Sequence, residues 1–230
     1  MSSTRTTTEE NVRQCVQRLR RLDCCAVSDA LDKLGLQGVV TGLPQRSGSG
    51  RIAGCVVTMK LGTGAPAPGP VKHLGCTAIE QSGPDNVIVI EQRTGMEAAC
   101  WGGLLSLGAK VRGVAGVVAD GPVRDIDEAI AYELPVFSRS LLPLTARARI
   151  VEKGTNVPVI MGSVAVNPGD FVIADRSGVA FIAAPDIATV RDAAEASVAR
   201  EAAMAKAILS GTPIGEVMGG NYENMLKRDS

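Results

Sequence analysis

The chain has 230 residues, of which 45% are hydrophobic but only 3% aromatic, and its 24 lysine and arginine residues balance 24 aspartate and glutamate residues. This length suits a single domain, residues 1–230, with a core of aliphatic side chains, as in layered proteins with buried strands. Nucleic-acid binding is not expected, because it depends on a basic surface and often on aromatic stacking.

The start of the chain is rich in serine and threonine and lacks the apolar stretch of a secretory signal. No run approaches the roughly 18–20 apolar residues of a membrane span. The six cysteines include no CxxC pair and His73 is the single histidine, so a Cys/His zinc site is not predicted. We expect a cytoplasmic protein with free thiols, no membrane contact and a flexible segment at residues 1–10.

The first third of the chain shows the spacing of two helices, then a strand, a loop and a short helix. In chain order these lie at 10–22, 28–34, 51–61, 62–70 and 71–81. Ser28 is the expected N-cap of the second helix and Gly35 its C-cap.

The middle of the chain alternates buried strands with helices. Strands at 86–92, 113–120 and 135–139 are separated by helices at 102–111 and 125–134. This β-α-β-α-β order predicts a parallel sheet with right-handed crossovers. Ligands bind beyond the carboxyl ends of such strands, so the loops after the first two strands should be neighbours in space.

Beyond residue 145 the pattern changes to several short strands within 157–182, with turns at NPGD and DRSG, followed by a long helix over 185–209. The strands indicate an antiparallel or mixed meander. The expected fold class is therefore α/β, with a parallel β-α-β-α-β centre, a mixed meander and a long C-terminal helix.

The segment DGPVRD, residues 120–125, places two acids and an arginine around an expected Gly-Pro turn at a strand end. Asp125 as a helix cap and Arg124 as a surface residue form one interpretation. In the other, the forked cation of Arg124 binds an oxyanion and Asp125 binds Mg²⁺ or Mn²⁺. Such a pair stabilises an enolate beside a carboxylate.

The segment CWGGLL, residues 100–105, is either a flexible joint or a helix start whose N–H groups and dipole hold a carboxylate. Gly103 precedes Arg124 by 21 positions, about one helix plus one strand, so the two loops should meet. His73 has either a structural role or a place in a loop that covers a pocket.

These motifs resemble the RraA-like family, which includes the 4-hydroxy-4-methyl-2-oxoglutarate / 4-carboxy-4-hydroxy-2-oxoadipate aldolases and proteins often mislabelled as demethylmenaquinone methyltransferases. The resemblance runs from VSDALDKLG through VKHLGCTAIE, RGVAGVVADGPVRD and LPVFSR to VNPGDFVIADRSGVAFI. It implies a swivelling β/β/α fold. It also implies homotrimers or homohexamers with sites at subunit boundaries.

The resemblance assigns roles to the matching residues. Asp125 binds a divalent metal, Mg²⁺ or Mn²⁺. Arg124 is catalytic and binds the pyruvate-like part of the substrate. The backbone N–H groups of Gly103, Leu104 and Leu105 hold the carboxylate.

One departure concerns proton transfer. The aldolases carry Asp or Glu at the position of Gly103, and this acid helps to organise the water that moves protons. A further acid from the C-terminal helix of a neighbouring subunit is expected near the metal. Glu201 is the nearest candidate, although Met204 is an alternative occupant of that place.

The function that the resemblance implies is a class II, metal-dependent carbon–carbon lyase. It would cleave a 4-hydroxy-2-oxo di- or tricarboxylic acid to pyruvate and decarboxylate oxaloacetate as a side activity. One alternative is a regulator that binds and inhibits ribonuclease E. Retention of Asp125 favours a metal-binding enzyme over this regulator. Another is an RraA-like enzyme for a different 2-oxo or hydroxy acid.

Overall fold

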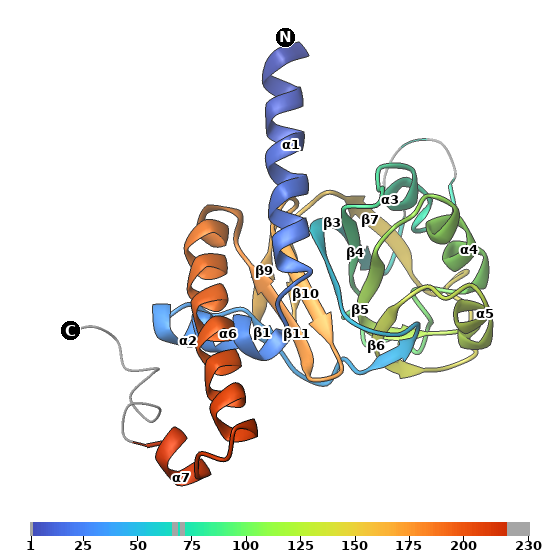
Figure 1. Ribbon diagram of the computed structural model, residues 1–230. Helices are drawn as coiled ribbons and strands as arrows, with labels where there is room; N and C mark the ends of the chain where they lie inside the picture. Colours follow the sequence, from blue (N-terminus) through green and yellow to red (C-terminus); the bar gives the residue numbers. More distant parts are fainter. Residues whose placement is uncertain (1, 66–68, 70–71, 220–230) are drawn as a thin grey trace.

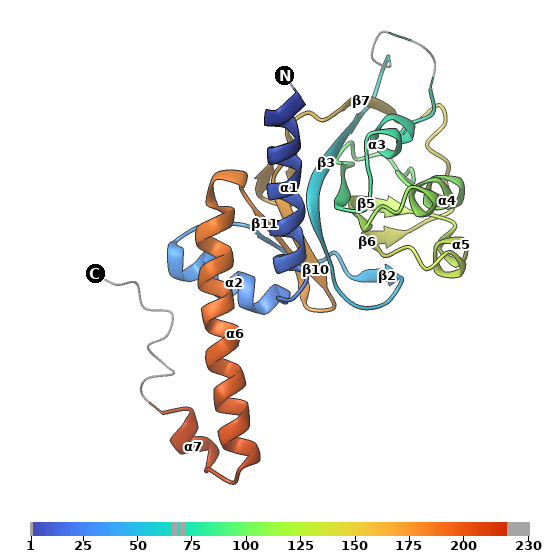
Figure 2. The ribbon, with the colours of Figure 1, turned by 45° about the horizontal axis from the view of Figure 1, so that its top comes forward.

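The computed structural model describes residues 2–65, 69 and 72–219, with side chains from residue 11 onward. A mixed sheet of nine strands runs through its centre. Helices α1 (Ser2–Leu19), α2 (Cys24–Leu34) and α6 (Ile187–Leu209) lie on one side of it. Helices α3 (Cys76–Glu80), α4 (Gly103–Val111) and α5 (Ile126–Ala131) lie on the other side (Figures 1 and 2).

The strands follow one another across the sheet in an order that differs from the chain order. They are β1 (Val39–Val40), β11 (Gly178–Ile182), β10 (Phe171–Asp175), β3 (Ile52–Gly62), β4 (Asn86–Glu91), β5 (Gly116–Val123), β6 (Val136–Leu141) and β2 (Gln45–Ser47), with β7 (Val151–Thr155) paired to β3. The pairs β3/β4, β4/β5 and β5/β6 are parallel. The predicted parallel centre is therefore confirmed.

The meander is confirmed as well. Strands β8 (Val159–Met161) and β9 (Val164–Val166) form a separate antiparallel pair, and β10 and β11 form another within the sheet. A 3-10 turn at Ala184–Asp186 leads into the long helix α6, and α7 (Ile214–Val217) follows it. Among the described helices, none combines the length and the apolar character needed to cross a membrane.

Several boundaries differ from those expected. Helix α1 starts at Ser2, because the segment that we expected to be flexible contains neither proline nor glycine to interrupt a helix. Helix α2 starts at Cys24 and not at Ser28, because the Asp23 side chain accepts the Ala26 N–H over 2.8 Å and caps it there. The expected C-cap is confirmed, since Gly35 has φ 69°. The loop predicted at 62–70 lies partly outside the described residues.

The expected Gly-Pro turn is also absent. Strand β5 continues through Gly121 and Pro122 to Val123 with a bulge between Ala119 and Pro122. A bulge tolerates proline because the ladder hydrogen bond is already interrupted there. Arg124 and Asp125 consequently leave the sheet at a strand end that is three residues farther along than Asp120.

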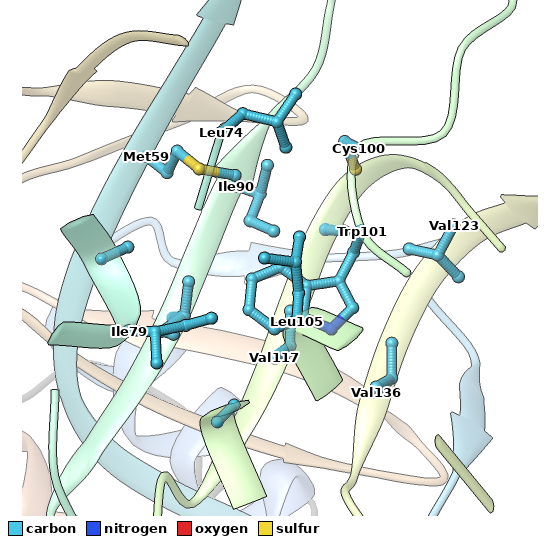
Figure 3. Packing of buried hydrophobic residues seen from close by; sticks show 14 of the residues in the cluster. Met59, Leu74, Ile79, Ile90, Cys100, Trp101, Leu105, Val117, Val123 and Val136 are labelled. Carbon is cyan, nitrogen blue, oxygen red and sulfur yellow. The ribbon is translucent and has the colours of Figure 1, made fainter. Parts of the chain in front are cut away.

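The helices of each side pack on the sheet through their own apolar cluster. The cluster beneath α3, α4 and α5 includes Trp101, Leu105, Ile79 and Ile90 (Figure 3). Trp101 is 2% exposed and lies near the middle of this cluster in the close-up. The start of α4 is therefore anchored in the core, which gives the adjoining loops a fixed place.

Candidate functional site

A cavity of about 460 Å³ lies where the first turn of α4 meets α3, the residues that follow β5 and the loop after β6. Gly102, Gly103 and Leu104 contribute one wall, and Arg124 and Asp125 contribute another. The cavity thus lies beyond the carboxyl ends of β4 and β5, where ligands bind in parallel sheets. The two motifs that we expected to meet do so here.

The first turn of α4 is held by a short chain of hydrogen bonds. Trp101 Nε1 donates to Ser106 Oγ over 3.0 Å, and Ser106 Oγ donates to the carbonyl of Gly102 over 3.1 Å. Because the first N–H groups of a helix have no intrahelical acceptor, those of Leu104 and Leu105 are free to bind an anion. The positive end of the helix dipole adds to this attraction.

Arg124 and Asp125 are held against the same turn. The Arg124 N–H donates to the carbonyl of Trp101 over 3.0 Å. Asp125 Oδ2 accepts hydrogen bonds of 3.1 Å from Gly103 N and of 3.1 Å from Arg124 Nε. The outer guanidinium nitrogens of Arg124 and the second carboxylate oxygen of Asp125 are left to bind other groups. Both side chains are about one-third exposed, at 36% and 35%.

Two further basic groups line the cavity. Arg147 comes from the loop after β6, and His73 comes from the loop before α3. Burial, followed by the positive charges of Arg147 and Arg124, lowers the pKa of His73 below its ordinary value of 6.5. His73 is therefore neutral at pH 7, and the arginines carry the positive charge of the cavity.

Cys76 and Cys100 both line the cavity, and Cys100 is not suited to act as a nucleophile. Cys100 lines the cavity, but burial raises the pKa of its thiol to about 12. Its Sγ–H donates to the carbonyl of Pro122 over 3.2 Å. A thiol that stays protonated at neutral pH does not attack a substrate, so covalent catalysis by Cys100 is not supported.

The Asp125 carboxylate fits a weakly held divalent cation. Mg²⁺ keeps several waters and uses one or two carboxylates together with substrate oxygens. Asp125 has one carboxylate oxygen free for this purpose. Within residues 2–65, 69 and 72–219, no three His, Cys, Asp or Glu side chains gather to form a complete metal cage. The chemistry of the donor set therefore suits a metal that is completed by substrate, by water or by a second subunit.

The predicted residues divide into two groups. Gly103, Leu104, Arg124 and Asp125 line one cavity together with Leu105. Glu201 does not join them within one chain, since α6 packs on α2 across the sheet from α4 (Figures 1 and 2). Its expected approach to the site of a neighbouring subunit stays a prediction.

The sequence did not point to Arg147 or Trp101 as parts of the site. Arg147 lies in an irregular loop more than 20 residues beyond Arg124, with no motif around it. Trp101 is the single tryptophan of the chain and lies inside CWGGLL, so its place could have been anticipated. The role of His73 had been left open, and its partly desolvated side chain lines the cavity.

The charge around His73 gives a first testable prediction. Oxalate, a dianion similar in size to the pyruvate enolate, should neutralise the field of Arg124 and Arg147 and raise the pKa of His73. By linkage, oxalate should bind more tightly as the pH falls through that pKa. Because the chain has one histidine, proton NMR can follow its ring signals without assignment. A His73 pKa at or above 6.5 without ligand, or one unmoved by oxalate, would contradict this arrangement.

Comparison with known proteins finds similar chains. The family model described as RraA-like, Aldolase/RraA, matches residues 24–181. A protein of Halalkalibacterium halodurans named "Putative 4-hydroxy-4-methyl-2-oxoglutarate aldolase" is 29% identical over 168 residues, which are 73% of this chain and 75% of that protein. Protein DlpA of Legionella pneumophila is 28% identical over 167 residues, 73% of this chain but 27% of DlpA.

Among solved structures, one of an uncharacterized protein from Pseudomonas syringae pv. tomato matches with a TM-score of 0.80 and 28% identity. The match covers 90% of this chain and 98% of that chain. The chain spans about a quarter of DlpA, so the similarity to DlpA concerns one portion of that larger protein.

Proposed function

Because the chain belongs to the RraA-like family, we propose that it is a divalent-metal-dependent carbon–carbon lyase that releases pyruvate from a 4-hydroxy-2-oxo acid. The observation that carries this proposal is the meeting of Arg124, Asp125 and the first turn of α4 in one cavity. A permanent cation, a hard carboxylate ligand and free N–H donors are the groups that stabilise an enolate next to a carboxylate.

Different groups of the chain would bind different parts of the substrate. The N–H groups of Leu104 and Leu105 hold the carboxylate of the 2-oxo acid and fix its orientation. The guanidinium of Arg124 binds the 2-oxo oxygen, where negative charge grows as the bond between C3 and C4 breaks. A Mg²⁺ or Mn²⁺ ion held by Asp125 would polarise the same carbonyl as a Lewis acid. Oxaloacetate decarboxylation passes through the same enolate and is the proposed side activity.

The cavity also supports a substrate with a second acid group. Arg147 lies in the cavity wall in addition to Arg124, and the neutral His73 adds a hydrogen-bonding group without charge. With Arg124 on the 2-oxo oxygen, Arg147 would match a further carboxylate of a 4-hydroxy-2-oxo dicarboxylic or tricarboxylic acid. An RraA-like enzyme that acts on another 2-oxo or hydroxy acid is the alternative that would use the same cavity.

The test is a coupled assay. The protein is incubated with 4-hydroxy-4-methyl-2-oxoglutarate or oxaloacetate and Mg²⁺, and pyruvate is followed with a dehydrogenase. Turnover that EDTA abolishes and added Mg²⁺ restores supports the lyase. Absence of turnover of both substrates with Mg²⁺ and with Mn²⁺ would reject the proposal. Binding to ribonuclease E in that case would favour the regulator.

We further propose that the active form is a homotrimer or a homohexamer. Leu104, Leu107 and Val111 recur on one face of α4, and their side chains are 82%, 38% and 79% exposed. Ile130 of the neighbouring α5 is 52% exposed. An apolar stripe of this kind beside a cavity is typical of a protein interface. Light scattering distinguishes three chains from six.

A further inference from the structure

The carboxylate of Glu128 lies against the first residue of α4. A Cβ atom added to Gly103 would lie 1.6 Å from Glu128 Oε2 and 2.4 Å from Glu128 Cδ, well inside van der Waals contact. Gly103 is not among the residues with positive φ. The backbone at position 103 does not call for glycine, but a side chain there would displace the exposed Glu128 carboxylate, which occupies that space.

Glu128 and Asp125 both lie against the start of α4. Asp125 is the N-cap of α5, and its Oδ2 accepts the Gly103 N–H. Glu128 lies in the first turn of α5, and its carboxylate occupies the space that a side chain at Gly103 would take. Among the described residues, the hydrogen bonds of this corner go to Asp125, from Gly103 N and from Arg124 Nε. Glu128 is exposed, and its carboxylate takes part in neither of these hydrogen bonds.

Retro-aldol cleavage needs such a group. The C4 hydroxyl must lose its proton, and C3 of the enolate must gain one. Asp125 is unsuited, because its Oδ2 already accepts hydrogen bonds and its charge is needed for the cation. The thiol of Cys100 is unsuited because burial keeps it protonated. Glu80 lines the cavity but forms an ion pair of 2.8 Å with Lys72. Glu128 does not itself line the cavity, but its carboxylate lies against Gly103, a residue of the cavity wall.

We propose that Glu128 is the acid–base residue of this cavity, an assignment that rests on the proposed lyase function. The Glu128 carboxylate takes the proton of the C4 hydroxyl, directly or through one water. The electrons of that O–H bond form the new C4 carbonyl, and the C3–C4 pair becomes the enolate of pyruvate. Protonated Glu128 then gives its proton to C3, which completes pyruvate and restores the carboxylate.

The first test is Glu128→Gln, which keeps the shape of the side chain and removes its basicity. We expect this substitution to change kcat for 4-hydroxy-4-methyl-2-oxoglutarate and kcat for oxaloacetate by different factors. Cleavage of the hydroxy acid should fall roughly 100-fold, because it needs proton removal from a hydroxyl, whereas decarboxylation does not. KM should stay within about threefold. Exchange of the methyl protons of pyruvate with D₂O, followed by NMR, should slow by a similar factor to the cleavage.

The second test moves the carboxylate. Glu128→Ala empties the volume beside Gly103, and Gly103→Asp in the same chain fills that volume with a carboxylate from α4. We expect the single Glu128→Ala variant to lose exchange and cleavage, and the double variant to recover to within roughly tenfold of wild type. Asp127→Asn, a change at an exposed acid in the same turn of α5, is the matched control and should leave kcat unchanged.

The outcomes separate the two proposals. A wild-type protein without turnover would reject the lyase function and this assignment with it. Wild-type turnover with full cleavage and exchange in Glu128→Gln would overturn only the assignment. The assignment would also be overturned if Gly103→Asp did not restore cleavage and exchange to a folded Glu128→Ala variant. It would be overturned as well if His73→Gln lost proton exchange while Glu128→Gln retained it. Loss in Glu128→Gln together with recovery in the double variant is the result we expect.

Discussion

Asp125→Asn should lower kcat for pyruvate release roughly 1,000-fold, which corresponds to about 4 kcal/mol of activation free energy. Asparagine keeps the size of the side chain and an oxygen that can accept the Gly103 N–H. It removes the negative charge that a hard divalent cation requires. The loss should therefore appear both in turnover and in Mg²⁺ affinity measured by calorimetry. Wild-type Mg²⁺ affinity in the variant would contradict the assignment of Asp125 as a metal ligand.

The same substitution should leave folding intact, so a loss of activity would not result from unfolding. Asp125 has φ 53°, a left-handed conformation that asparagine adopts as readily as aspartate. Its ion pair with Arg124 is about one-third exposed on both sides and contributes little to stability. Asp127→Asn, two residues farther on, should retain both activity and cation binding. Equal losses in the two variants would point to a general effect of charge.

The sequence predicted the part of the site that depends on periodicity and chain order. Strand and helix periods located the parallel centre, and the rule for carboxyl ends brought Gly103 and Arg124 together. Both results depend on local patterns repeated along the chain. The same patterns misplaced the Gly-Pro turn, because proline at a bulge and proline in a turn look alike in sequence.

The remaining parts of the site depend on contacts between distant segments. Arg147 and His73 reach the cavity from irregular loops, where no periodicity fixes a position in space. Glu128 has the spacing of an ordinary exposed helix residue, and its relation to Gly103 follows from the packing of α5 against α4. The resemblance indicated that an acid was missing at Gly103. It could not indicate which side chain occupies the space that glycine leaves.

Asp120, the other acid of DGPVRD, has a different role from Asp125. It is 6% exposed within β5, and it pairs with Arg139 Nε over 2.5 Å through Oδ1. Its Oδ2 accepts the Gly162 N–H over 2.7 Å. The carboxylate thus joins β5 to Arg139 of β6 and to the turn between β8 and β9. It is absent from the cavity wall formed by the described residues.

Asp120→Asn should consequently destabilise the protein by about 2–3 kcal/mol, because the amide nitrogen must face either the guanidinium of Arg139 or the Gly162 N–H. The value lies in the range for hydrogen bonds to a charged group, reduced for Arg139, which is 37% exposed. Urea unfolding measures the change, and kcat of the folded fraction should stay within about threefold of wild type. A stable but inactive Asp120→Asn variant would assign Asp120 to the chemistry. The expected Asp120→Asn variant is destabilised but active, whereas the expected Asp125→Asn variant is stable but inactive. This contrast would assign Asp120 to the structure of β5 and Asp125, five residues farther on, to the chemistry of the cavity.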